Sequence, residues 1–310
     1  MTKRQHLRTS VNKSLRGVRS PRITRPRRMP RRSKRVDAIR NIVVVSDLHC
    51  GCQLGLCPPD GMALDEGGRV MPSPLQRKVW AMWESFWGDW VPNATRGEPF
   101  SVVFNGDAMD GRHHNATTQM SHNLKDQVAL AHRILAPVVQ ACEGRYWHIR
   151  GTEAHVGPSA AEEEALAKML GAIPNADGQY ARWELWKRLG RHLVHFLHHI
   201  GSTGSQAYES TALMKEMVES FVETGRWGDQ PPQIIVRSHR HRCLELRMPT
   251  VGGYGMAVVT PAWQLKTPFV YRIPGARLSQ PQIGGVLLRL GDEEVYSRSK
   301  VWRIERPEAE

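Results

Sequence analysis

Apolar and polar positions change period several times between residue 41 and the end of the chain. Four short apolar runs have the length of strands and are each followed by polar residues: 42–45, 100–104, 146–150 and 234–236. Four longer stretches carry apolar side chains at helical spacing: 75–91, 124–142, 160–171 and 206–224. Strands that alternate with helices predict an α/β layered domain, which we place over residues 41–310.

The remaining segments add a hairpin, a β-rich end and a long loop. Residues 182–189 and 191–197 are predicted to pair about Gly190. Further strands are expected near the C-terminus: 251–259, 269–273, 285–290 and 295–302. Residues 51–74 are rich in Gly and Pro and predict a long loop, which in a domain of this kind is usually functional or mobile. Four tryptophans recur at helical spacing within 80–90 and are expected to pack in the core or against another subunit rather than to stack bases.

Charge divides the chain into two parts. The formal net charge is +13, yet residues 1–40 contain 15 of the 43 Lys and Arg and only one of the 30 acidic residues. We predict that this basic segment is disordered on its own and is attracted to polyanions such as nucleic acid. A solubilising extension and an arginine-rich organelle transit segment remain as alternatives. The domain that follows is nearly neutral.

Composition excludes two classes of protein. Apolar residues are 40% and charged residues 24%, as in globular domains. No apolar run approaches the roughly 20 residues of a membrane-spanning helix, and the N-terminus lacks the apolar segment of a signal peptide. Five cysteines make an odd number in a chain of 310 residues and favour a reducing compartment over a disulfide framework. We therefore expect a cytoplasmic protein without a membrane partner.

Asp and His side chains follow five of the predicted strands. The five sets are Asp47-x-His49, Gly106-Asp107, Gly151-Thr152-x-x-His155, His198-His199 and His239-x-His241. In α/β folds the carboxyl ends of strands build the sites. Each set alone is a weak indication, but five in order predict a metal site. Carboxylate oxygen together with imidazole nitrogen suits transition ions such as Mn, Fe or Zn.

This order of motifs resembles the calcineurin-like metallophosphoesterase superfamily, over about residues 42–242. The resemblance implies a four-layer α/β/β/α sandwich that holds two divalent ions, Mn, Fe or Zn. It also implies a ligand set: Asp47, His49, Asp107 and His241 for the first ion, and the bridging Asp107, His198 and His239 for the second. The resemblance favours His198 over His199, because family members with a His-His pair at this step resemble other members that have only the first His.

The chain departs from the family pattern at two steps. Ser238 replaces the Gly before His239, a small residue for a small one. The Gly-Asn-His step reads Gly-Thr-Glu-Ala-His at 151–155, which is similar to some phage or prophage members. The position of the family's Asn ligand is therefore occupied by Thr152.

Several residues compete for the roles that this step leaves open. The missing ligand of the second ion could be Thr152, Glu153 or Asn115. His155 is our candidate for the general acid that protonates the leaving group. Arg112 could bind phosphate oxygens through its forked donors, or could be a solvated charge of its loop.

The resemblance implies hydrolysis of phosphomonoesters or phosphodiesters by a hydroxide that bridges two divalent ions, for which manganese is one candidate. Phosphodiesters, including those of nucleic acids, are favoured because Asp110 precedes Gly-Arg rather than the Arg-Gly pair of protein phosphatases. The alternative is a nucleic-acid-binding or packaging-associated protein that keeps the fold with little turnover. The oligomeric state and the physiological substrate stay open.

Overall fold

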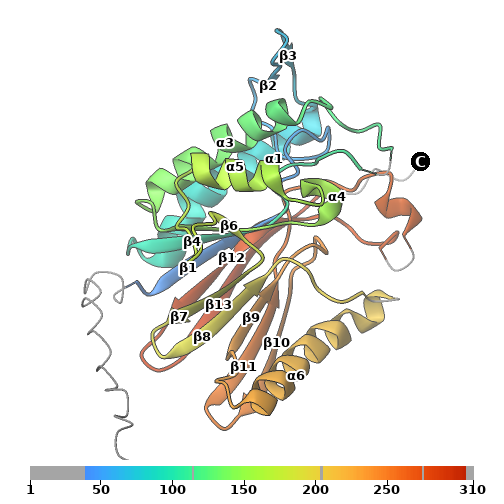
Figure 1. Ribbon diagram of the computed structural model, residues 1–310. Coiled ribbons are helices and arrows are strands. Elements are labelled where there is room, and N and C mark those ends of the chain that lie inside the picture. Colours follow the sequence, from blue (N-terminus) through green and yellow to red (C-terminus); the bar gives the residue numbers. More distant parts are fainter. Residues whose placement is uncertain (1–38, 114, 203–204, 274–275, 305–310) are drawn as a thin grey trace, which may run out of the picture. The chain divides into compact units, whose positions relative to one another are not determined.

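Two β-sheets lie face to face between helices (Figure 1). This computed structural model describes residues 39–113, 115–202, 205–273 and 276–304, so the prediction for the basic N-terminal segment falls almost wholly outside the described residues. The six-stranded sheet contains, in order, β13 (Val295–Arg303), β12 (Gln282–Leu290), β1 (Asn41–Val45), β4 (Phe100–Asn105), β5 (Tyr146–Ile149) and β6 (Ala181–Arg182). The five-stranded sheet contains β10 (Leu244–Thr250), β11 (Gly253–Val259), β9 (Ile234–Arg237), β8 (His192–Leu197) and β7 (Glu184–Leu189).

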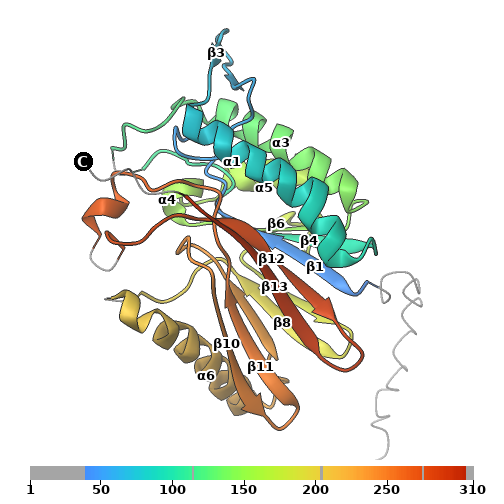
Figure 2. The same cartoon turned by 180° about the vertical axis from the view of Figure 1, so that it is seen from behind.

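Helices cover the outer face of each sheet, as Figures 1 and 2 show from opposite sides. The six-stranded sheet is covered by α1 (Pro74–Ser85), α3 (Leu124–Ala141) and α5 (Ala161–Met169). The five-stranded sheet is covered by α6 (Glu209–Trp227). The other helical segments are η2 (Phe86–Trp90), α2 (Val91–Thr95), α4 (Glu153–Val156), η3 (Gln206–Tyr208) and η4 (Val270–Arg272). The predicted four-layer sandwich is confirmed.

Three hydrophobic clusters fill the three interfaces between these four layers. Successive side chains of a strand point to opposite faces, so Val43 and Val45 of β1 pack toward the helices. Ile42 and Val44 of the same strand pack between the two sheets. Leu213 of α6 belongs to the third cluster, between that helix and the five-stranded sheet. The continuous apolar run in β1 is therefore explained by burial on both faces.

Parallel pairing brings the ends of the central strands together. β1 pairs in parallel with β4, and β4 with β5, while β8 pairs in parallel with β9 in the other sheet. Each of these strands runs directly into one of the Asp- or His-containing segments noted above. Among the described residues no helix has the length and apolar character that crossing a membrane requires.

The structure corrects several local expectations. The prediction of a strand over 269–273 is wrong. The backbone amides of Val270 and Arg272 donate to carbonyls three residues earlier and form the short helix η4. Strand β10 was not predicted, although its residues alternate in burial. The loop 51–74 contains a small hairpin of β2 (Met62–Ala63) and β3 (Arg69–Val70).

The tryptophan-rich stretch continues past the predicted helix, since α1 runs on through η2 into α2. Trp83 and Phe86 are buried and make edge contacts with Trp263, with ring centroids 4.8 and 5.5 Å apart. The aromatic stripe is therefore part of the core, as expected.

Candidate metal centre

The backbone of the predicted ligands is unusual. Five of the six have positive φ angles: Asp47 (56°), His49 (46°), Asp107 (57°), His239 (69°) and His241 (53°). Residues with a Cβ seldom adopt this left-handed conformation, which costs about 1–3 kcal/mol each and persists only where the surroundings enforce it. Here the amide of Asp47 donates to Gly106 O at 2.9 Å, and that of His49 to Asp107 O at 3.2 Å. Backbone strain concentrated on the candidate ligands indicates a functional site at the carboxyl ends of these strands.

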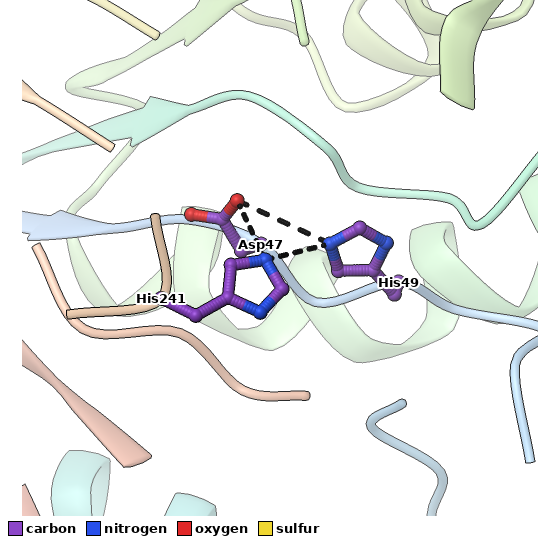
Figure 3. Close-up of side chains that lie close together, drawn as sticks. All are labelled: Asp47, His49 and His241. Atoms are coloured by element: carbon purple, nitrogen blue, oxygen red, sulfur yellow. Dashed lines mark hydrogen bonds and ion pairs between the residues drawn. The ribbon is translucent and has the colours of Figure 1, made fainter. Parts of the chain in front are cut away.

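The first ligand group consists of Asp47, His49 and His241 (Figure 3). Nε2 of His241 lies 3.3 Å from Oδ1 of Asp47 and 3.2 Å from Nε2 of His49, which is 4.0 Å from the same oxygen. Asp47 is fully buried, and within the described part of the chain no hydrogen bond of good geometry reaches either carboxylate oxygen. Nδ1 of His49 faces Oδ1 of Asp110 at 3.3 Å, so the ring proton belongs there and Nε2 keeps its lone pair.

These atoms fit one divalent cation. Ligand atoms about 2.1 Å from an ion at the tetrahedral angle lie about 3.4 Å from one another. The three separations in the first group are 3.2, 3.3 and 4.0 Å. The two imidazole nitrogens are within hydrogen-bond distance of each other, but the buried carboxylate of Asp47 has no hydrogen bond of good geometry among the described residues, so a cation at the centre would balance its charge. An Asp with two imidazoles is the donor set of a transition ion rather than of Ca²⁺ or Mg²⁺.

The second group consists of Asp107, His198 and His239. Nε2 of His198 lies 3.0 Å from Oδ2 of Asp107, and Nδ1 donates to the carbonyl of Asn105 at 2.6 Å, which again leaves Nε2 to face the centre. The two groups are neighbours, because Nε2 of His198 is also 3.9 Å from Oδ1 of Asp47. Asp107 further forms a group with His49 and His155, so its carboxylate lies close to both sets.

Opposite charges govern the protonation of these side chains. Burial alone would raise the pKa of Asp47, but His198 and His241 bring it down to about 2. Burial disfavours the charged form of His198, yet Asp107 and Asp47 raise its pKa to about 10. Burial and the neighbouring His155 lower the pKa of His49 to about 4. Without an ion, a proton on His198 balances the two carboxylates, and a bound cation would replace it.

The candidates for the missing ligand lie in different surroundings. Thr152 is buried and donates to Asp107 twice over: its amide to Oδ1 at 2.8 Å and its hydroxyl to both oxygens at 3.3 Å. Glu153 and Asn115 are exposed, and Glu153 belongs to none of the ligand groups found among the described residues. The contacts of Thr152 are those of a residue that orients Asp107.

His155 lies beside the first group. Nδ1 donates to the carbonyl of Asp110 at 2.6 Å, and its ring meets that of His49 edge-on with centroids 4.4 Å apart. Its side chain is 14% exposed, so the ring can be reached from solvent. Arg112 is exposed, and Nε donates to the carbonyl of His122. The structure thus places His155 at the centre and Arg112 on the adjoining loop.

Asp110 was not predicted as part of the site. It is 1% exposed, and its carboxylate faces Nδ1 of His49 at 3.3 Å and Nε2 of His113 at 3.4 Å. Burial would raise its pKa, but these two imidazoles hold it well below the usual range. The Asp-x-x-Asp spacing after β4 was the signal that could have identified it.

A chain of buried hydroxyls also escaped prediction. Nδ2 of Asn105 donates to Oγ of Ser238 at 2.7 Å, and Ser46 and Ser238 each bond Oγ1 of Thr260 at 2.7 Å. Three of these residues stand one or two positions before a candidate ligand. Ser238 is therefore more than a small replacement for Gly, because its hydroxyl ties the two sheets together where the ligands emerge.

No protein-family model matches the chain, and neither does any curated protein. Among solved structures, it is similar to vacuolar protein sorting 29 from Cryptosporidium parvum, with 11% identity and a TM-score of 0.31 over 86% of this chain and 98% of that one. A Thermotoga maritima protein solved by NMR has 9% identity and a TM-score of 0.34, over 85% and 100%. The sulfate thiohydrolase SoxB from Thermus thermophilus has 12% and 0.34, over 85% and 56%. Likenesses of this size carry no argument about family or function, so the proposal below depends on the chain's own residues.

Proposed function

We propose that the chain is a metal-dependent phosphoric ester hydrolase of the calcineurin-like metallophosphoesterase superfamily. The observation that carries this proposal is the convergence of Oδ1 of Asp47 with Nε2 of His49 and Nε2 of His241. Neither oxygen of the buried Asp47 carboxylate has a hydrogen bond of good geometry among the described residues. A second Asp-His-His group adjoins it. Two neighbouring sets of this composition, at the ends of parallel strands, suit a dinuclear hydrolytic centre.

Some of these side chains would bind the ions, and other groups orient the ligands by hydrogen bonds. Asp47, His49 and His241 would hold one ion, and Asp107, His198 and His239 the other, with Asp107 shared. Two divalent cations at this place would bind phosphoryl oxygens and lower the pKa of a water between them. The carbonyl of Asn105 and the carboxylate of Asp110 keep the ring protons of His198 and His49 away from the centre.

His155 is the proposed general acid. Its Nδ1 proton is fixed on the carbonyl of Asp110, so Nε2 is the atom that would carry a proton to the leaving oxygen. Imidazole is the side chain that exchanges protons near neutral pH. Mutual edge contact with His49 keeps the ring beside the first ligand group.

Phosphodiesters are the proposed substrate class, with nucleic acid as their source. The 15 Lys and Arg of residues 1–40 would add affinity for a polyanion. Arg112, on the loop that follows Asp110, supplies further donors for phosphate oxygens once it releases the carbonyl of His122.

The test uses the full chain stripped of metal by a chelator. Mn²⁺, Fe²⁺, Zn²⁺ or Ni²⁺ is then added, and hydrolysis of a nitrophenyl phosphate and of a bis-nitrophenyl phosphate is measured. We expect metal-dependent turnover that a chelator abolishes, faster on the diester. No turnover of either ester with all four metals would contradict the proposal and favour the nucleic-acid-binding alternative.

A matched deletion tests the role of the basic segment. Removal of residues 1–38 should leave turnover of the small esters intact, while affinity for single-stranded DNA falls and its salt dependence flattens. A collapse of small-ester turnover would instead make the segment part of the active site.

A further inference from the structure

One buried carboxylate connects two of the ligand-bearing loops without belonging to either ligand group. Glu163, in the first turn of α5, is completely buried. The amide of Gly151 donates to its Oε2 at 2.7 Å, and the amide of Ala108 donates to its Oε1 at 3.3 Å. These two amides come from the loops after β5 and β4. The side chain therefore holds together two segments that are more than forty residues apart in the sequence.

Both of these amides adjoin the groups that fix Asp107. Ala108 follows Asp107 directly, and Gly151 precedes Thr152, whose amide donates to Oδ1 of Asp107 at 2.8 Å. The backbone at Gly151 packs tightly against Asp107, because a Cβ on Gly151 would lie 1.9 Å from the same oxygen. Asp107 has a φ of +57°, so its backbone must be held by its surroundings.

A buried polar chain in turn supports Glu163 from the neighbouring strand. Nε2 of His148 lies 3.6 Å from Oε1, and the hydroxyl of Tyr146 bonds Nδ1 of the same ring at 2.8 Å. Both side chains are fully buried. Both oxygens of the Glu163 carboxylate thus have a backbone donor, and Glu163 belongs to none of the ligand groups found among the described residues.

We propose that Glu163 is a positioning residue of the metal centre, which keeps the carboxylate of Asp107 in the orientation that a cation requires. The inference builds on the proposed function, since it assumes that Asp107 binds metal. Glu163 acts by joining the Ala108 and Gly151 amides, so that Thr152 can hold Oδ1 while Oδ2 faces His198. Outer groups of this kind set metal affinity nearly as strongly as the ligands do.

The next residue of α5 provides a matched control. Glu164 also accepts two backbone amides, those of Tyr180 and Ala181, each at 2.8 Å. These amides belong to the segment entering β6, away from the ligand loops. Glu164 is partly exposed and also accepts from Nη2 of Arg150 at 3.4 Å, so the two residues are not equivalent in burial. Both lie on the same helix turn and accept two backbone amides, and only Glu163 accepts the amide that follows Asp107.

The experiment compares Glu163→Gln with Glu164→Gln in the full chain. Mn²⁺ and Zn²⁺ affinity and stoichiometry are measured by calorimetric titration, and thermal unfolding is measured without metal. We expect Glu163→Gln to weaken metal binding 10- to 100-fold and Glu164→Gln to change it less than twofold. Glu163→Asp, which keeps the charge on a shorter side chain, should recover part of the affinity.

The outcomes separate this inference from the proposed function. A wild-type chain that binds neither ion would refute the proposed metal centre itself. If the wild type binds metal and Glu163→Gln binds it equally tightly, the positioning role is overturned and the proposed function is not. Equal losses in the two Gln variants would also overturn it, because they would show that the effect is one of general stability.

Discussion

The carboxylates of the two ligand groups are held in different ways. Asp107 receives the amide and hydroxyl of Thr152 and faces His198 at 3.0 Å, so its orientation is set by the protein. Asp47 has no hydrogen bond of good geometry on either oxygen among the described residues and lies only near imidazole nitrogens. Both are fully buried.

This difference indicates that the protein orients the carboxylate of Asp107, whereas in the proposed centre the carboxylate of Asp47 would depend on the cation. An ionised carboxylate without donors is costly in a protein interior unless a positive charge accompanies it. For Asp47 that charge comes from protonated His198 in the metal-free chain and from the ion in the loaded one. The hydrogen bonds from Thr152 to Asp107 need no cation. Variants of Asp107, Asp47 and Thr152 test this contrast, and a variant of His195 tests the charge balance beside the site.

Asp107→Asn should have the largest effect. It removes the charge that both ligand groups share, so we expect ester turnover to fall about 10³-fold or more and bound metal to decrease in both groups. Turnover and metal content after dialysis are the measurements, with the exposed Asp89→Asn as control. Turnover within tenfold of the wild type would show that Asp107 is not shared.

Asp47→Asn should have a smaller and more local effect. It removes the carboxylate of the first group only, so we expect the loss of one equivalent of metal and about a 10²-fold fall in turnover. The second group should keep its ion, since Asp107 and its donors are untouched. Equal metal loss in the Asp47 and Asp107 variants would contradict the contrast between the two groups.

The layers of the fold could be predicted because periodicity reports burial. The apolar runs of β1 and β4 are buried on both faces, and the strand-helix alternation fixed the order of the elements. Strand β10 was missed although Leu244, Leu246 and Met248 alternate with polar residues, which is the pattern of a half-buried strand. The single turn η4 is defined by which backbone groups bond, and its side chains do not reveal that.

The candidate site divides in the same way. Asp47, His49 and His239 stand at spacings that motif order can reveal. Motif order could not identify Glu163, because Glu163 acts through hydrogen bonds from the backbone amides of two loops that are distant in the sequence. Thr260 likewise contributes only through hydroxyls that folding brings to it. Candidate ligands can be proposed from sequence motifs, whereas the residues that hydrogen-bond to them are found only in the structure.

His195, on the strand β8 that precedes His198, provides a third test. Burial and the nearby Arg237 lower the pKa of His195 to about 4, against the 6.5 of an ordinary imidazole. Its folded pKa is below the unfolded one, so its stabilisation is complete above pH 6.5 and is lost as the pH falls toward 4. We expect this to cost about 2 kcal/mol, measured by denaturant unfolding at pH 7.5 and 4.5. If His195→Gln loses as much stability over this interval as the wild type, the assignment fails.

Thr152→Val should have the smallest effect and decides whether Thr152 supports Asp107 or binds metal itself. Valine keeps the β-branched shape and the backbone amide that donates to Oδ1 at 2.8 Å, and removes only the two hydroxyl contacts at 3.3 Å. Loss of such long hydrogen bonds costs less than about 1 kcal/mol, so metal affinity of the second group should fall about threefold. A hydroxyl that was itself a ligand would cost 100-fold or more on removal. Calorimetric titration with Mn²⁺ distinguishes the two, because a threefold loss confined to one of the two binding events means that Asp107 is held by the amide of Thr152, as its hydrogen bonds indicate.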